Sequence, residues 1–261
     1  MNYKASNMDI LIQEKTQAQQ VPAVEIIDLK KSFEANHVLK GFNLTIQPKE
    51  NVAVLGKSGS GKSVLIKCIV GLIRPDAGQI RVFGQDVVNL ERQELDEVRS
   101  RIGFLFQSNA LYDSLTVREN LEFPMRRLRI KKTKEQVDQM VHDALTSVGL
   151  PNVQDLMPSS LSGGMKKRIG LARTLIMEPR IILYDEPTTG LDPITSKEIA
   201  NLMNDVHRKY QTSSIIISHD MSCIKRTAQR IVVLNDGIDY LQGNYEELKE
   251  SKDEIVRSFF L

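Results

Sequence analysis

The most restrictive feature of this sequence is a glycine-rich segment that follows a short apolar run and precedes a helix-like stretch. The apolar residues 52–55 have strand character, and the turn-forming residues 48–51 stand before them. The pattern G-x-x-x-x-G-K-[ST] predicts a phosphate-binding loop when it lies between a strand and a helix, and a flexible turn is the alternative. The residues that meet this pattern are Gly56, Lys57, Ser58, Gly59, Ser60, Gly61, Lys62 and Ser63.

The residue types in this loop suit the phosphates of a nucleotide. Its glycines allow backbone N–H groups to point at phosphate oxygens, and the helix that starts near Gly61 adds its positive N-terminal end. Lys62 would reach the β- and γ-phosphates, and the Ser63 hydroxyl would complete a Mg²⁺ site. The loop therefore predicts a site for a nucleoside triphosphate with magnesium.

A second apolar run ends in two carboxylates. Residues 181–184 have the character of a buried strand, and Asp185 and Glu186 follow directly. In a fold with a phosphate-binding loop, such a strand carries Asp185 beside the magnesium and Glu186 toward the attacking water. The alternative is that Glu186 is an acidic N-cap, because the residues that follow it also suit a helix start.

A third motif distinguishes between classes of protein with such a loop. Ser162, Gly163 and Gly164 stand at the start of a helix-like segment, where they make a second anion-binding helix N-terminus. A kinase or GTPase has no use for this second site. With Leu161 before it and Met165 after it, the motif resembles the LSGGQ signature of the ATP-binding cassette (ABC) family, although glutamine is common where Met165 stands.

Further ABC motifs follow in the family's order, and the resemblance assigns roles to them. Gln107 resembles the Q-loop glutamine, Asp192 belongs to a D-loop-like segment, and His219 resembles the switch histidine that orients the attacking water. Phe33 matches the aromatic on which adenine stacks, with an ordinary core phenylalanine as the alternative. The resemblance implies ATP and Mg²⁺ as cofactors. The implied site comprises Glu186, His219 and Gln107 in catalysis, Ser63, Gln107 and Asp185 at the metal, and Phe33, residues 56–63, residues 162–164 and Asp192 around ATP.

The order of the predicted elements indicates the fold class. Strands that alternate with helices favour a largely parallel α/β sheet, and antiparallel strands near the start make the sheet mixed. The resemblance implies a P-loop NTPase fold of the ABC ATPase type, with an antiparallel β subdomain and an inserted α-helical subdomain. We expect a polar tail over residues 1–22, the ATP-binding domain over 23–243 with its helical subdomain at about 108–160, and a short helical segment over 244–261.

Composition excludes several other classes of function. Lys and Arg number 35 and Asp and Glu number 33, and this balance argues against a dedicated nucleic-acid binder, which needs a basic excess. No apolar run approaches the ~18 residues of a membrane span, and the first residues lack the pattern of a secretory signal. Cys68 and Cys223 form no close pair, which suits a reducing compartment. We therefore expect any membrane role to be peripheral.

Within the family the chain looks most like the Mla/Mkl-type ATPases, which power phospholipid transport between bacterial membranes. The resemblance rests on residues 105–120, on the LSGGMKKR segment 161–168 and on YDEPTTGLDPITS, residues 184–196. It implies four kinds of partner: a second copy of this chain, an MlaE-like membrane permease, an MlaD-like lipid-binding MCE protein and, as a further candidate, a STAS-domain subunit. It also implies a peripheral position on the cytoplasmic face of the inner membrane, with no nucleic-acid partner.

Alternatives stand beside this function and beside two of the segments. A soluble cassette of the iron–sulfur assembly type, or an importer of another substrate, would carry the same ATPase motifs. The basic run from Arg126 to Lys134 suits anionic lipid headgroups, although a solvated face or loop is the plainer interpretation. The apolar residues of segment 255–261 suit docking onto the subunit's own core, and contact with a second copy is the alternative.

Overall fold

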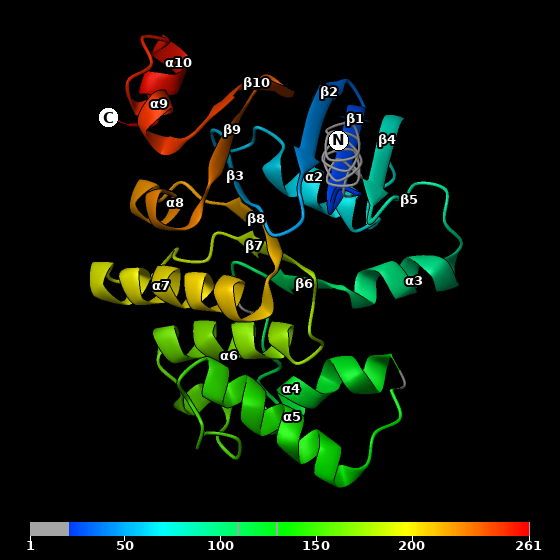
Figure 1. The fold of residues 1–261 in the computed structure, drawn as a ribbon, viewed down its shortest axis with the longest axis vertical. Helices are drawn as coiled ribbons and strands as arrows, with labels where there is room; N and C mark the ends of the chain where they lie inside the picture. Colours follow the sequence, from blue (N-terminus) through cyan, green and yellow to red (C-terminus); the bar gives the residue numbers. More distant parts are fainter. Residues whose placement is uncertain (1–20, 109, 129, 261) are drawn as a thin grey trace, which may run out of the picture.

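Two β-sheets and the helices around them form the part of the chain that the computed structural model describes, residues 21–108, 110–128 and 130–260. Figure 1 shows the sheets in the upper half and the helices α4, α5 and α6 below them. Most of the predicted polar tail lies outside the described residues, as do Arg129 of the basic run and Leu261. In the parts of the chain described here, no helix is long and apolar enough to cross a bilayer.

The larger sheet has the strand order β10-β9-β3-β8-β7-β6. All neighbours from β9 to β6 are parallel, and β10 pairs antiparallel with β9. The strands β3, β7 and β8 are buried along nearly their whole length, which explains their continuous apolar runs. The bounds are β3 Asn51–Leu55, β6 Ile102–Leu105, β7 Ile181–Asp185, β8 Ser213–Ile217, β9 Arg230–Asn235 and β10 Ile238–Gly243.

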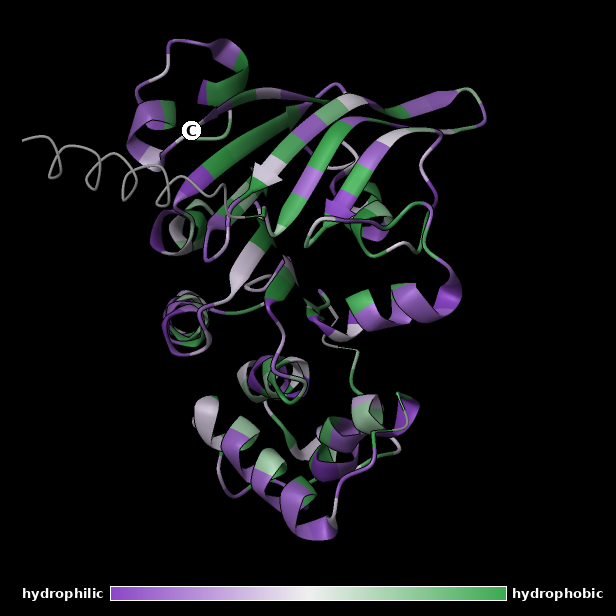
Figure 2. Ribbon diagram, turned by 45° about the vertical axis from the view of Figure 1, so that its right-hand side comes forward, coloured by the Kyte–Doolittle hydropathy of each residue, from purple (hydrophilic) through white to green (hydrophobic). Residues whose placement is uncertain are grey.

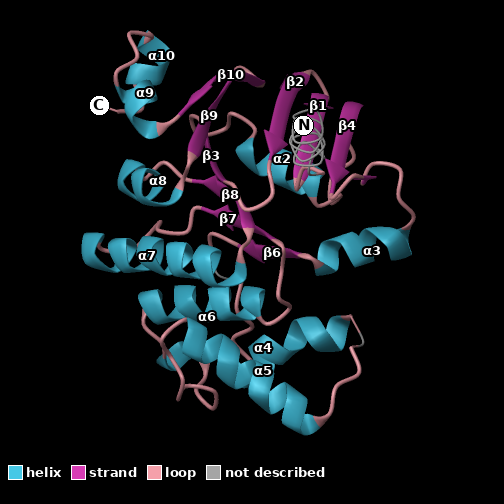
Figure 3. Ribbon diagram, in the orientation of Figure 1, coloured by secondary structure: helices cyan, strands magenta, loops and turns pink. Residues whose placement is uncertain are grey.

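The smaller sheet is antiparallel and has the order β2-β1-β4-β5. Figure 3 shows it beside the end of the larger sheet that carries β10 and β9. Together the two sheets confirm the predicted mixed α/β fold of the ABC ATPase type. The bounds are β1 Val24–Phe33, β2 Asn36–Ile46, β4 Ala77–Val82 and β5 Gln85–Asp86.

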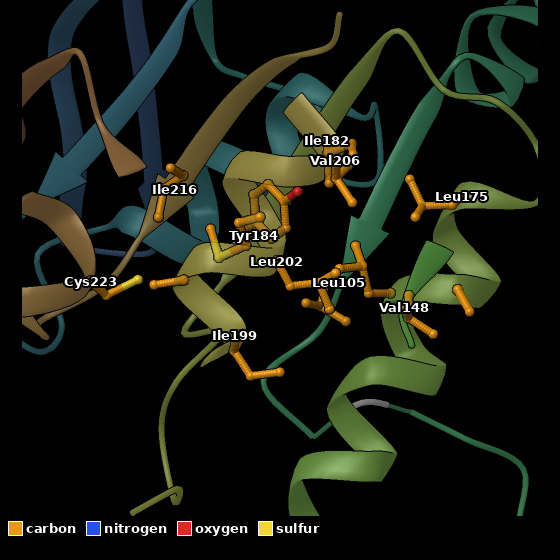
Figure 4. Packing of buried hydrophobic residues seen from close by; sticks show 14 of the residues in the cluster. Leu105, Val148, Leu175, Ile182, Tyr184, Ile199, Leu202, Val206, Ile216 and Cys223 are labelled. Atoms are coloured by element: carbon orange, nitrogen blue, oxygen red, sulfur yellow. The ribbon is translucent and has the colours of Figure 1, made fainter. Parts of the chain in front are cut away.

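Two hydrophobic cores cover the opposite faces of the larger sheet. Because side chains alternate along a strand, Ala53 and Leu55 of β3 enter one core and Val52 and Val54 enter the other. Figure 4 shows the first core, in which Tyr184 of β7 lies among side chains of the helix that follows it. Figure 2 shows apolar residues concentrated on the strands, while α4 and α5 present many hydrophilic residues. Burial on both faces makes the larger sheet a rigid support for the loops at its edge.

The chain between β6 and β7 runs through α4, α5, a short 3₁₀ turn and α6. The helix α5 begins after Thr133, whose side chain caps it, and ends before Gly149, which has φ +72°. The described members of the basic run are exposed at the end of α4 and before α5. The helix bounds are α2 Lys62–Ile69, α3 Arg92–Ser100, α4 Val117–Arg127, α5 Lys134–Ser147, α6 Gly163–Leu175, α7 Pro193–Tyr210, α8 Met221–Thr227, α9 Tyr245–Lys249 and α10 Glu254–Arg257, with the 3₁₀ turn at Pro158–Ser160.

The apolar residues near the C-terminus dock on this subunit's own core. Val256 is fully buried, and Phe259 and Phe260 pack against the first core. The ring of Phe260 meets Tyr245 edge-on, with 5.4 Å between the ring centroids. The prediction of docking onto the subunit's own core is therefore confirmed for the described residues of this segment.

Candidate functional site

Several predicted site residues lie at one edge of the larger sheet, at the ends of neighbouring parallel strands. The strands β3, β8, β7 and β6 lie side by side and run in the same direction, so their carboxyl ends meet at the same edge (Figure 1). In sheets of this kind, ligands bind outside the carboxyl ends of the strands. The residues that follow these ends are the glycine-rich loop after β3, His219 after β8, Asp185 and Glu186 at the end of β7, and Gln107 after β6.

The glycine-rich loop is held in a shape that only its sequence allows. Gly61 precedes α2 with φ +104°, and a Cβ atom there would lie 2.8 Å from the Val38 Cγ1 atom. A Cβ atom on Gly56 would lie 2.5 Å from the Ser60 hydroxyl oxygen. That oxygen is buried and has no hydrogen-bond partner within the described structure. The close contacts at both glycines therefore hold the loop against its neighbours and leave no room for a Cβ atom at either position.

The Lys62 ammonium group currently bonds to the loop itself. Its Nζ donates to the carbonyl oxygens of Gly56 at 2.7 Å and Lys57 at 2.9 Å. Burial lowers the pKa of Lys62, and the nearby carboxylates of Glu186 and Asp185 oppose this effect. The side chain thus places a partly desolvated cation inside the loop, where an anion would gain most from it.

The two carboxylates at the end of β7 differ in environment. Burial and the neighbouring Glu186 raise the pKa of Asp185, while Lys62 and Lys167 act in the opposite direction. Glu186 has φ +51°, a left-handed backbone conformation that is uncommon for residues other than glycine. The next helix, α7, begins only at Pro193 and is capped by Asp192. Glu186 is therefore not the helix cap that was the alternative.

The Glu186 side chain is fixed by two neighbours. The Thr189 hydroxyl donates to its Oε2 atom at 3.0 Å, and His219 Nδ1 lies 2.8 Å from the same oxygen. A carboxylate oxygen accepts only, so Nδ1 carries the proton and Nε2 is the ring nitrogen left for another contact. The His219 side chain is 71% exposed, while that of Glu186 is 14% exposed. His219 therefore joins the carboxylate to the solvent side of the site.

These residues line one cleft of about 600 Å³. Phe33 lies on its wall and is 45% exposed, so it is not the core phenylalanine that was the alternative. Lys57 and Ser60 belong to the loop without lining the cleft. The predicted residues that the cleft brings together are Phe33, Gly56, Ser58, Gly59, Gly61, Lys62, Ser63, Gln107, Asp185, Glu186 and His219.

The remaining predicted residues do not line this cleft and lie together elsewhere. Ser162 caps α6, its hydroxyl oxygen accepting from the Met165 N–H at 3.2 Å. A Cβ atom on Gly164 would lie 2.7 Å from a methyl carbon of Thr195 in α7. The Asp192 carboxylate accepts bonds from Ile194 and Thr195, so it serves as a helix cap, and its contact with a nucleotide stays a prediction. Within one chain, the signature and D-loop-like segments are therefore neighbours outside the cleft.

Comparison with known protein families identifies the family of this chain. The model of the ABC transporter family matches residues 39–189, more than half of the chain. This chain belongs to the ABC transporter family. It is thus an ATPase whose hydrolysis of ATP is coupled to transport.

Three relatives show the breadth of the family around this ABC protein. The chain is 40% identical to TRIGALACTOSYLDIACYLGLYCEROL 3 of Arabidopsis thaliana, with 90% of this chain and 72% of that protein covered. It is 38% identical to the methionine import protein MetN of Rhizobium etli, covering 95% and 68%. It is 35% identical to the probable ribonucleotide transport protein mkl of Mycobacterium tuberculosis, covering 91% and 66%.

Solved structures agree with the fold of this ABC protein. CbiO1 of Clostridium perfringens has a TM-score of 0.81 at 30% identity and covers 91% of this chain and 94% of its own. A dimer of the cassette MJ0796 bound to ADP and phosphate has a TM-score of 0.77 at 30% identity, covering 85% and 98%. Both values confirm the ABC ATPase fold.

Lys167 is a charged residue behind the cleft that none of the motifs indicated. It lies on α6 and is only 3% exposed, and its Nζ atom donates to the carbonyl oxygens of Gln107 at 2.6 Å and Glu186 at 3.4 Å. The sequence pattern could have indicated its burial. Lys167 precedes the apolar Leu171 and Leu175 by four and eight residues, so the three side chains lie on the same buried face of the helix. A charge in a buried helical stripe needs partners.

Proposed function

We propose that this chain is the ATP-hydrolysing subunit of a bacterial ABC transporter that moves phospholipid between membranes. The convergence of the glycine-rich loop, Gln107, the β7 carboxylates and His219 in one cleft is the observation that carries the ATPase mechanism. The Mla/Mkl resemblance of residues 105–120 and 161–168 supports the lipid cargo. The name of the Arabidopsis relative, which is that of a galactolipid, points in the same direction.

The chemical groups that line the cleft are suited to bind ATP and magnesium. The lack of room for any side chain at Gly56 and the left-handed backbone of Gly61 suit a tight loop that closes on phosphate oxygens. Ser63, Gln107 and Asp185 offer hydroxyl, amide and carboxylate oxygens, which are the ligands that Mg²⁺ takes beside substrate phosphates. When bound, Mg²⁺ would neutralise charge that develops on the transferred phosphoryl group. The half-exposed ring of Phe33 would stack on adenine.

Glu186 would act as the general base of hydrolysis. Its carboxylate is mostly shielded from solvent, and Thr189 and His219 orient the Oε2 atom, which leaves Oε1 to accept the proton of the attacking water. His219 would present Nε2 toward the γ-phosphate while Nδ1 remains bonded to Glu186. Lys62 would exchange its two loop carbonyls for phosphate oxygens.

A second copy of the chain would complete each ATP site. Residues 162–164 and Asp192 lie outside the cleft of their own subunit, and the N-terminus of α6 has an exposed serine and glycine. A helix start of this kind suits the γ-phosphate held by a partner's cleft. The dimeric structures of MJ0796 support this arrangement.

The transporter would contain an MlaE-like permease and an MlaD-like MCE protein, with a STAS-domain subunit as a further candidate. The chain would lie on the cytoplasmic face of the inner membrane. The helical subdomain at residues 108–160, inserted into the domain at 23–243, would pass motion from the ATP sites to the permease. Binding of ATP would close the dimer and hydrolysis would reopen it.

A second candidate cargo is methionine. The support for it is the 38% identity to MetN over 95% of this chain, close to the identity with the Arabidopsis protein. The two candidates share the ATPase mechanism and differ in the permease, so only the partners and the cargo can separate them.

The test is a mild-detergent purification of tagged Glu186→Gln protein from its own membranes, followed by mass spectrometry of proteins and extracted lipids. We expect an MlaE-like permease, an MCE protein and phospholipid, with the tagged Lys62→Ala protein as a control for contacts that need no ATP. A methionine permease in their place would favour the second candidate. Recovery of soluble partners alone would retain the ATPase and contradict transport.

A further inference from the structure

Lys167 is a buried charged residue to which the proposed mechanism gives no role. Its burial of 97% is unusual, since lysine is rarely this buried unless its ammonium group has partners. An apolar side chain would fill the same stripe of α6 beside Leu171 without the cost of desolvating a charge. The residue therefore needs an explanation beyond packing.

The partners of Lys167 belong to two residues of the ATP site. Its Nζ atom donates to the backbone oxygen of Gln107 at 2.6 Å and to that of Glu186 at 3.4 Å. Burial lowers the pKa of Lys167, and the charges of Asp185 and Glu186 oppose that effect and favour the ammonium form. Because the bonds go to backbone oxygens, the ammonium group holds the chain segments that carry the two side chains.

The backbone of Glu186 requires such support. Its φ of +51° is a strained conformation that persists where surrounding contacts hold it. The Glu186 N–H donates to the Ile217 carbonyl at 2.8 Å, which fixes one side of the residue. The bond from Lys167 reaches the other side, at the carbonyl of the same residue. The two bonds together set the direction in which the Glu186 carboxylate points.

Lys167 also lies close to the start of the signature helix. It follows Gly163 by four residues, one turn of α6, and the Ser162 carbonyl accepts from the Lys166 N–H at 2.9 Å. A helix moves as a rigid element over one turn. A displacement of residues 162–164 would therefore displace the ammonium group and the two carbonyls bound to it.

We propose that Lys167 is a positioning residue that joins the signature helix to the backbone of Gln107 and Glu186 in the same subunit. This inference rests on the proposed function. It means that the ATP held by the partner, through the N-terminus of α6, influences the placement of the general base in a subunit's own cleft. The two sites of the dimer are thereby connected through a single side chain in each subunit.

The first test compares Lys167→Met with Lys167→Arg in the full-length protein. Methionine keeps most of the volume and removes the donors, so kcat for ATP hydrolysis should fall by on the order of 10² while the affinity for ATP changes by less than about threefold. Arginine restores a donor and should recover much of kcat. The matched control is Lys166→Met, the neighbouring lysine of α6, which should keep the wild-type kcat. If methionine prevents folding, Lys167→Leu, which also lacks a donor, takes its place.

A second measurement reports on the Gln107 segment without hydrolysis. The chain has no tryptophan, and Phe106, which precedes Gln107, is 40% exposed, so Phe106→Trp introduces a single indole beside the contact. Adding Lys167→Met should raise the quenching of its fluorescence by acrylamide, because the segment loses its bond to α6. Adding Lys166→Met should leave the quenching unchanged.

The outcomes separate this inference from the proposed function. A wild-type kcat in Lys167→Met, an equal loss of kcat and ATP affinity without rescue by arginine, or unchanged quenching would overturn the positioning role. Absence of ATP hydrolysis by the wild-type protein would contradict the proposed function instead. In that case the quenching measurement still decides whether Lys167 holds the Gln107 segment.

Discussion

Glu186 combines a left-handed backbone with a carboxylate whose Oε2 atom is bonded by Thr189 and His219. Replacing it with glutamine preserves the size of the side chain but removes the carboxylate that we propose as the base. We expect Glu186→Gln to bind ATP as the wild type does and to hydrolyse it on the order of 10² to 10⁴ times more slowly. Single-turnover hydrolysis and nucleotide-binding measurements check this.

The control for this prediction is Glu178→Gln. Glu178 also has a positive φ, of 48°, but it is exposed and does not line the cleft. Its substitution should leave the rate unchanged. Turnover of Glu186→Gln at the wild-type rate would place the base elsewhere in the cleft.

The charged form of Asp185 lowers the stability of the folded protein, because its carboxylate is partly buried beside Glu186. Burial and the charge of Glu186 raise its pKa above the ordinary 3.8. A carboxyl group whose pKa is higher in the folded than in the unfolded chain binds its proton more readily when folded. The free energy of unfolding therefore falls as pH rises from about 4 through the raised pKa, and the cost is complete above it.

We predict that Asp185→Asn raises the melting temperature of the nucleotide-free protein at pH 7 and has a smaller effect at pH 4. The same substitution should weaken Mg²⁺-dependent ATP hydrolysis, because an amide replaces the charged ligand. Thermal melting at the two pH values checks the first part, with Asp113→Asn, an exposed aspartate, as the control. A melting temperature of Asp185→Asn below that of the wild type at pH 7 would contradict the destabilising effect of the Asp185 charge.

At the scale of elements, α4 depends on one buried amide. Asn120 is fully buried; its Oδ1 atom accepts from the Tyr112 N–H at 2.8 Å, and its Nδ2 atom donates to the carbonyls of Tyr112, Leu115 and Thr116. These bonds fasten the chain that enters α4 to the helix itself. They pair the Tyr112 N–H and the Leu115 carbonyl, whereas the carbonyls of Tyr112 and Thr116 also accept from the N–H groups of Leu115 and Asn120.

We predict that Asn120→Ala lowers the free energy of unfolding by about 2 to 3 kcal/mol, since it removes a buried amide together with the bonds to the Tyr112 N–H and the Leu115 carbonyl. For a chain of this size, this corresponds to a fall in melting temperature of roughly 4 to 10 °C. Denaturant titration and thermal melting measure the two quantities. Gln139→Ala on the exposed face of α5 should change the free energy by no more than about 0.5 kcal/mol.

At the scale of the molecule, the separation of the two halves of the ATP site leads to a complementation test. Lys62→Ala removes the cation of the cleft, and Ser162→Arg obstructs the N-terminus of α6, so each variant alone should lack hydrolysis. A mixed dimer contains one intact site, built from the cleft of one variant and the signature helix of the other. An equal mixture should recover up to about a quarter of the wild-type rate.

Steady-state hydrolysis across a series of mixing ratios measures this recovery. The mixture should lose its activity again when dilution dissociates the dimer. An equal mixture that stays inactive while forming mixed dimers, or full activity of Ser162→Arg alone, would contradict a site shared between two chains.

The elements that local patterns define were predicted from the sequence. The apolar runs at residues 52–55, 181–184 and 214–218 predict β3, β7 and β8, and the amphipathic pattern of residues 134–148 predicts α5, because both patterns repeat within a few residues. The strand–loop–helix order around Lys62 and the carboxylates after residues 181–184 identified the two ends of the cleft. The helical pattern of residues 163–177 extends two residues beyond α6, which ends at Leu175. The strand β5 has two residues, and α3 contains only two apolar residues, Leu95 and Val98, so neither element was predicted.

What the sequence by itself determined is the chemistry available to this protein: a phosphate-binding loop, a carboxylate pair and a signature helix start, each encoded in neighbouring residues. Only the tertiary structure decided which of them meet. Strand order β3-β8-β7-β6 brings Gln107 and His219 to Glu186, and it leaves Ser162 outside the cleft. It also buries Lys167 against the carbonyls of two distant segments. Pairing between distant strands is stabilised by burial across the whole sheet, and no local run of residues records it.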